Sequence, residues 1–434
     1  MAIPKAKLRA SKQEATNEWL AGRAMPAGGA WATAARKEAV ERVRALTLPT
    51  KRDEYWKYTD PTSLTAAEAP EASLFEITDE GAVFEQIDRV RLVFVDGVFD
   101  AAASDDPSLA GVEITRLAEA AGNDIHWAKD YYGVLEAAGQ SPVERPLAAF
   151  NTAFADDGVL IRATGKAEKP VSLIYERGEK AGDAMLHHVI RVEPGAELTV
   201  LENGPAAARF SQVMEVDVAD GGRLHHVRAQ GRDHERRAVT HLFARLGEES
   251  TLKSFTLVAN GRLTRNEAVV WLQGENGAAH ISGASMGDGE FLGDDTVFVT
   301  HSAPHCESRQ VFKKVLRGGA VGVFQGKILV EQPAQKTDGY QISQSLLFDE
   351  RSQFLAKPEL EIYADDVQCS HGSTSGEIDP DHLFYMRARG IPQAEAESLL
   401  VLAFIAEAIE EIEDETLAED IRARLSRWLE RRRA

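Results

Sequence analysis

The chain has 434 residues, of which 44% are hydrophobic and 27% charged, a balance typical of a soluble globular protein with two or three domains. Its 49 basic and 69 acidic side chains give a formal net charge of −20, which argues against binding to nucleic acid or to an anionic membrane. It has two cysteines, no apolar segment after its basic N-terminus and no apolar run long enough to span a membrane, so we expect a cytoplasmic protein without a disulfide framework.

The N-terminal part of the chain predicts helices. Residues 12–22 and 34–46 carry apolar side chains at helical spacing, and Gly28-Gly29 marks a break between them. Residues 51–59 concentrate aromatic and charged side chains, and we expect a loop whose rings pack on the domain rather than a ligand site. Residues 89–98 are typical of a strand.

The middle of the chain, residues 159–363, consists of short apolar runs separated by turn residues, and four of its segments share one pattern. Each has a polar turn, then a small residue, then a strand-like alternation. The small residues recur at intervals of 26, 28 and 27 residues, at Ala196, Gly222, Ser250 and Gly277. Such a period predicts a solenoid, here a parallel β-helix. A β-sandwich, the alternative, does not require a repeated turn at fixed spacing.

The C-terminal part predicts helices again. Asp379-Pro380 is typical of a helix start, Gly390 ends that helix, and Pro392 begins the next. Two apolar stripes follow, Leu399, Leu402, Ala406 and Ile409, then Leu417, Ile421, Leu425 and Trp428. Such short helices have little core of their own. Each apolar stripe is therefore interpreted either as core packing or as a face that meets a partner.

Cys369 and His371 form the main candidate site. If this segment is extended, residues two apart point to the same side. Thiolate and imidazole are good ligands for iron or zinc, but two ligands cannot complete a tetrahedral site, so others would come from elsewhere in the chain or from another subunit. The alternative is a buried cysteine and a hydrogen-bonded histidine at a domain junction.

Other histidines are better explained by packing. For His301, His305 and Cys306 we expect a core cysteine beside solvated histidines, although His301 could face inward. In the pairs His187-His188 and His225-His226, neighbours in a strand face opposite sides, so we expect one of each pair inside and the other exposed.

Common catalytic motifs are absent from the sequence. It contains no P-loop, dinucleotide fingerprint or nucleophile elbow. The carboxylate pairs at residues 156–157 and 294–295 are interpreted as turn residues.

Seven motifs distributed over much of the chain resemble those of the SufB/SufD family of iron–sulfur cluster assembly scaffold proteins. They occupy residues 54–59, 147–158, 308–310, 323–326, 334–339, 358–372 and 383–392. The Cys-Ser-His-Gly run at 369–372 and the small number of cysteines favour the D branch of the family over the B branch.

The resemblance implies a right-handed parallel β-helix at residues 146–368, between a mostly helical domain at 1–145 and a helical domain at 369–434 that docks an ATPase. It implies a non-catalytic scaffold subunit that pairs with SufB through the β-helix ends and joins the ATPase SufC, which hydrolyses ATP. A homodimer is an option when SufB is absent, and neither nucleic acid nor membrane is an expected partner.

The resemblance also implies the site. His371 and Cys369 would lie at the cluster-assembly interface, with His371 as a metal ligand shared with SufB. The only expected cofactor is a transient iron–sulfur cluster at that interface. The implied ATPase-docking region comprises Leu383, Phe384, Arg387, Arg389, Leu399, Leu400 and Phe404.

Three alternatives remain. One is a SufB-like scaffold, and another is a purely structural β-helix partner without a ligand. The third, a carbohydrate-active β-helix enzyme, would need a groove with clustered Asp and Arg side chains.

Overall fold

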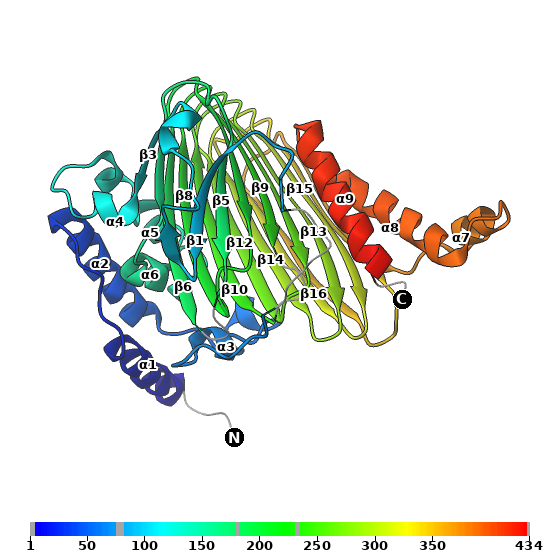
Figure 1. Cartoon of the computed structure of the whole chain (residues 1–434), viewed down its shortest axis with the longest axis horizontal. Coiled ribbons are helices and arrows are strands. Elements are labelled where there is room, and N and C mark those ends of the chain that lie inside the picture. The colour runs from blue at the N-terminus through cyan, green and yellow to red at the C-terminus, as the bar shows by residue number, and fades with distance from the viewer. Residues whose placement is uncertain (1–4, 75–81, 179–181, 231–234, 432–434) are drawn as a thin grey trace.

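The computed structural model describes residues 5–74, 82–178, 182–230 and 235–431. Its central feature is a parallel β-solenoid of about seven turns, flanked by N-terminal and C-terminal helices (Figure 1). Consecutive solenoid strands alternate between two sheets, so each turn adds one strand to each sheet. The predicted β-helix between two helical regions is confirmed.

Sheet A contains, in spatial order, β2 (Val98–Asp100), β1 (Val90–Val95), β5 (Val171–Glu176), β7 (Glu197–Asn203), β9 (Arg223–Gln230), β11 (Thr251–Ala259), β13 (Ala278–Asp288), β15 (Glu307–Arg317), β17 (Asp338–Leu347) and β19 (Gln368–Gly376). Sheet B contains β3 (Glu113–Arg116), β4 (Val159–Ala163), β6 (Asp183–Val192), β8 (Arg209–Val218), β10 (Arg237–Leu246), β12 (Leu263–Leu272), β14 (Leu292–His301), β16 (Val321–Val330) and β18 (Gln353–Ile362). The helices are α1 (Lys5–Ala21), α2 (Ala30–Leu46), α3 (Thr62–Thr65), α4 (Leu117–Ala120), α5 (Val134–Ala138), α6 (Pro146–Phe154), α7 (Pro380–Arg387), α8 (Gln393–Ile409) and α9 (Glu415–Arg431), with 3₁₀ turns η1 (Glu54–Trp56), η2 (Pro107–Ala110) and η3 (Trp127–Asp130).

The small residues of the repeat lie where each turn enters sheet A. Arg223 pairs with Thr251, and Thr251 pairs with Ala278, so the residues just before them stack in successive turns. Space there is tight, since a Cβ at Gly222 would lie 2.9 Å from the Ala219 carbonyl oxygen. Ala196 and Ser250 carry a Cβ at the equivalent positions and are fully buried, so the turn accommodates a small side chain there.

The interior core of the solenoid is built from one side of each strand. Ala268 and Val270 of β12 and Val297 and Val299 of β14 face it, two residues apart as the strand period requires. Burying a valine side chain of this kind contributes about 1.5–3 kcal/mol relative to exposure.

Helices pack on part of the outer face of each sheet (Figure 1). Phe150 of α6 packs with Val239 and Leu263 of sheet B, and Ile405 of α8 belongs to a cluster with Leu257 of sheet A. Strands buried on both faces carry near-continuous apolar runs, which explains the composition of the middle region. Among the described helices, none is long and apolar enough to cross a membrane.

The face of α8 that packs on sheet A differs from the predicted one. Val401 and Ile405 are fully buried, whereas Leu399 is 43% exposed. Of the predicted stripe only Ile409 is buried, because α8 is apolar around most of its circumference and spacing alone could not select the packed face. In α9 the predicted stripe, Leu417, Ile421, Leu425 and Trp428, is buried as expected.

The histidine pairs are only partly as predicted. His188 and His226 are buried inside the solenoid, where His188 Nδ1 accepts from a backbone N–H at 3.0 Å. The expected exposure of their neighbours is wrong: His187 is fully buried against the ring of Tyr132, and His225 is half-buried. Both lie on outer faces that the helical regions cover.

Candidate functional site

The two ends of the solenoid are built differently. At one end the sheets finish with β2 and β3, three and four residues long, which pair antiparallel with β1 and β4. At the other end they finish with β18 and β19, ten and nine residues long, each paired on one side only among the described strands. Long edge strands present backbone N–H and C=O groups to which another chain can pair. We call β18 and β19 the open end.

Cys369 and His371 both lie on β19, at the open end. His371 pairs in register with Gln341 of β17. Because β19 is extended, the two side chains point to the same side, as predicted for an extended segment. That side faces the solenoid interior, since Gln341 is fully buried and pairs with Gln310, two residues from the core side chain Phe312.

The two side chains differ in environment. Cys369 packs beside Ile328 and Leu360, and a Cβ at Gly339 would lie only 3.2 Å from its Sγ. Burial raises the pKa of the Cys369 thiol, while a hydrogen bond from the Gly339 backbone acts in the opposite direction. His371, by contrast, is exposed. Within the described ranges, no group of three or more His, Cys, Asp and Glu side chains is placed to hold a metal ion.

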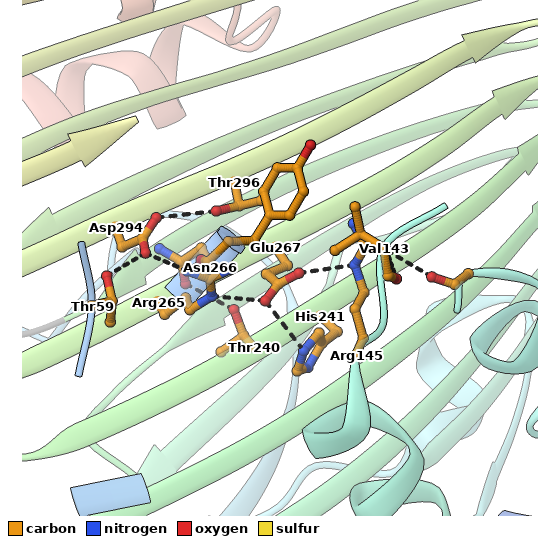
Figure 2. Close-up of polar contacts among 12 residues, drawn as sticks. Thr59, Val143, Arg145, Thr240, His241, Arg265, Asn266, Glu267, Asp294 and Thr296 are labelled. Carbon is orange, nitrogen blue, oxygen red and sulfur yellow. Dashed lines mark hydrogen bonds and ion pairs between the residues drawn. The ribbon is translucent and has the colours of Figure 1, made fainter. Parts of the chain in front are cut away.

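A second polar cluster lies on the outer face of sheet B, shown in Figure 2. Glu267 accepts hydrogen bonds from Arg145 Nε at 2.8 Å and from Arg265 Nε at 2.7 Å. Arg265 also donates to Asp294, which accepts from Thr59 as well. The two arginines and two carboxylates are each at most 2% exposed, so their charges are both buried and balanced.

This buried charge cluster fixes the N-terminal region to the solenoid. Burial alone would raise the pKa of Glu267, but Arg265 and Arg145 lower it to about 2. The cluster combines Asp and Arg side chains, as a groove on a β-helix enzyme would, but residues 55–59 and 143–145 cover it (Figure 2). The sequence did not predict this cluster, because its members come from distant segments. Charged residues inside otherwise apolar strands were the one feature of the sequence that pointed to it.

The carboxylate pair 294–295 was predicted to be a turn, and this is wrong. Both residues lie within β14, where successive side chains face opposite sides. Asp294 points to the outer cluster, and Asp295 points to the interior, where it bonds Lys314 of the opposite sheet. Each carboxylate has a buried cation as its partner, which allows it to occupy a strand position.

The aromatic segment 51–59 packs on sheet B, as predicted. Trp56 is 4% exposed, and the Arg265 guanidinium lies 4.1 Å from the centre of its ring. The Tyr55 hydroxyl donates to Glu359 of β18 at 2.7 Å, and Lys357 lies 4.0 Å from the Tyr55 ring. The segment therefore also supports the edge strand β18.

The second histidine–cysteine cluster is structural. Cys306 is fully buried in the interior core, as expected. His301 also faces inward, with Nε2 2.8 Å from Ser308 Oγ, so the expectation of solvated histidines holds for His305 but not for His301.

The residues predicted to dock an ATPase lie on α7, α8 and the turn between them. Phe384 is 73% exposed, and Arg387 and Arg389 are exposed beside it. Phe404 instead packs against sheet A, with Lys313 Nζ 4.9 Å from its ring centre. Leu383 and Leu400 are half-buried, and Leu399 is exposed.

Because several histidines are buried, we expect the fold to lose stability in mild acid. Burial lowers the pKa of His188 to about 3 and those of His241 and His301 to about 4, from an ordinary 6.5. Below pH 6.5 the unfolded chain binds protons that the folded chain does not. The free energy of unfolding should therefore fall by about 1.4 kcal/mol per pH unit for each histidine, until the folded-state pKa is reached.

Urea unfolding between about pH 7 and pH 5 measures this slope. His241→Leu removes one titrating group and should reduce the slope by about 1.4 kcal/mol per pH unit. Val239→Ala, at a buried position on the same face of β10, removes no titrating group and is the control; it should lower stability without changing the slope. Equal slopes in the native chain and in His241→Leu would contradict the assignment.

The fold and its open end define a β-solenoid protein with one end available for pairing. Two family models match the chain: "SUF system FeS cluster assembly, SufBD core domain" over residues 175–404, and "SufBD protein N-terminal region" over residues 29–173. The chain therefore belongs to the SufBD family of the SUF system for iron–sulfur cluster assembly.

Within that family the chain is a homologue of SufD. It is 31% identical over 396 residues to the iron–sulfur cluster assembly protein SufD of Escherichia coli, covering 88% of this chain and 89% of that protein. It is 26% identical over 403 residues to SufD of Bacillus subtilis, covering 88% and 90%. A SufBD family protein of Synechocystis is 25% identical over 397 residues, covering 87% and 86%.

Proposed function

We propose that the chain is a non-catalytic scaffold subunit that pairs through its open end with a SufB-type subunit and docks the ATPase SufC on its C-terminal helices. The observation that supports this proposal is the asymmetry of the solenoid. One end is closed by short antiparallel strands, and the other presents two long parallel edges. Strand pairing by a second solenoid would satisfy both edges at once.

The nascent iron–sulfur cluster would be a transient substrate held between the two subunits. Cys369 and His371 supply a thiol and an imidazole on the same side of β19. Two donors are fewer than a four-coordinate site needs, so the partner would supply the remaining ligands. Cys369 and His371 lie on an edge strand, so the residues of a strand added by the partner would lie beside them. The two subunits could then share the ligands of one cluster.

The C-terminal helices offer the surface for the ATPase. α7 has no buried residue, and Phe384 and Tyr385 are 73% and 57% exposed. An exposed aromatic pair of this kind is typical of a protein-binding surface. Arg389 lies over the Tyr385 ring at 3.5 Å and adds a cationic rim.

Co-expression with SufB and SufC, followed by native mass spectrometry, tests the pairing. Ser373→Pro in β19 removes a backbone donor from the open edge, because the Gln368 N–H bonds back to Thr337 and the odd-numbered residues of β19 therefore point their N–H groups away from β17. We expect the assembled fraction to fall about tenfold or more. Ser373→Ala loses the same hydroxyl contact with Ser343 but keeps the backbone N–H, so it is the matched control and should assemble normally. Assembly of Ser373→Pro at the native level would contradict pairing through β19.

His371→Ala tests the cluster role separately. We expect this variant to assemble with SufB and SufC but to reconstitute little cluster, measured by the visible absorbance of the purified complex. His305→Ala, at an exposed histidine away from the open end, is the control. Unchanged cluster yield in His371→Ala would leave the chain a structural partner without a ligand role.

A further inference from the structure

The residues behind His371 form a buried ladder. Gln310 in β15, Gln341 in β17 and His371 in β19 pair in register, so their side chains stack on the interior side of sheet A. Gln341 Nε2 donates to Gln310 Oε1 at 2.8 Å, and both glutamines are fully buried. His371 is the outermost member of the ladder.

The amide oxygen of Gln341 is buried without a hydrogen-bond partner among the described residues. A buried acceptor in that state is costly, and native structures almost always provide a donor. The neighbour of Gln341 on the open side is His371, one strand spacing of about 4.8 Å away, and a neutral imidazole has one ring N–H to donate.

We propose that Gln341 is a positioning residue, which accepts a hydrogen bond from one ring nitrogen of His371 and so selects its tautomer. The other ring nitrogen then keeps its lone pair for a metal ion. The inference rests on the proposed function, because it assigns Gln341 a purpose in preparing His371 as a ligand. The hydrogen bond to Gln310 fixes the orientation of the Gln341 amide. The Gln341 amide would in turn orient the ring of His371 at the edge of the sheet.

Gly326 provides the space in which this amide lies. It sits in β16 of the opposite sheet, across the interior, and a Cβ there would lie 2.4 Å from Gln341 Nε2 and 2.6 Å from its Cδ. Even alanine at 326 would force the amide to move. Gly339 gives similar room to Cys369, as its missing Cβ would lie 3.2 Å from Sγ. The glycines that end the segments 323–326 and 334–339 thus shape the last turn of the solenoid.

The tautomer of His371 can be read in the isolated full-length chain by NMR of the ring nitrogens in ¹⁵N-histidine-labelled protein at alkaline pH. His371→Ala identifies the signal. We expect one dominant tautomer in the native chain, and in Gln341→Leu a fall of about fivefold in the ratio of major to minor tautomer. Gln341→Glu keeps an acceptor oxygen and should restore the native ratio. Gly326→Ala, which leaves both ladder residues in place, should shift the ratio as Gln341→Leu does.

Gln325→Leu is the matched control, because Gln325 is also a fully buried glutamine with an unpartnered amide oxygen, but it bonds to Tyr55 in the N-terminal region. It should lower stability without changing the His371 signal. An unchanged tautomer ratio in both Gln341→Leu and Gly326→Ala would overturn the proposal. This measurement needs no SufB, so its outcome is independent of whether the chain pairs or holds a cluster.

Discussion

Replacing Glu267 with glutamine is expected to lower the free energy of unfolding by about 3–5 kcal/mol, because Arg145 and Arg265 would stay buried with a single carboxylate, Asp294, between them. Urea unfolding followed by circular dichroism measures the loss. Residues 55–59 of the aromatic segment should become susceptible to proteolysis at the same time. Arg265 holds them through the Tyr55 carbonyl oxygen and the Trp56 ring.

Glu54→Gln is the control for this experiment. Glu54 belongs to the same N-terminal segment and contacts Lys357 at 2.6 Å, but its side chain is 71% exposed. Water screens such a pair, so the change should stay within about 0.5 kcal/mol. A similar loss in both variants would mean that burial does not set the strength of the Glu267 interactions.

Replacing Ile405 with alanine is expected to cost about 2–5 kcal/mol of packing between α8 and sheet A, since the side chain is fully buried in the cluster that joins them. The loss should be local. Hydrogen exchange in α8 and α9 should accelerate strongly while exchange in the solenoid strands stays slow.

Leu399→Ala, on the same helix, provides the comparison. Leu399 is 43% exposed, so its truncation should change packing stability by less than about 0.5 kcal/mol. If Leu399 has the larger effect, the helix packs with the face that spacing suggested rather than the one in the structure. Leu399 is also a proposed ATPase contact, so Leu399→Ala should weaken SufC binding. Ile405→Ala should instead weaken the packing of α8 on sheet A.

Much of the architecture could be predicted from local pattern. The period of Ala196, Gly222, Ser250 and Gly277 indicated the solenoid, because each turn buries a small residue at the same point. The stripe of α9 was also predicted correctly, since its polar and apolar faces are clearly separated. Features that repeat or alternate over a few residues need no knowledge of distant contacts.

The candidate site was only partly visible in the sequence. Spacing placed Cys369 and His371 on one side of an extended segment, and β19 has that geometry. Spacing could not show that β19 is an edge, nor that Gln341 lies behind His371, because both follow from the register between strands. Residues 30 positions apart become neighbours only when successive turns stack.

The sequence by itself determined the order of elements, the solenoid repeat and the segment that carries Cys369 and His371. Only the tertiary structure decided which faces are covered: Val401 and Ile405 rather than Leu399 pack on sheet A, and His187 is buried where exposure was expected. It also assembled the buried charge cluster from segments more than a hundred residues apart. Strand and turn patterns are set by near neighbours in the chain, whereas burial and charge pairing depend on how distant helices dock on a sheet.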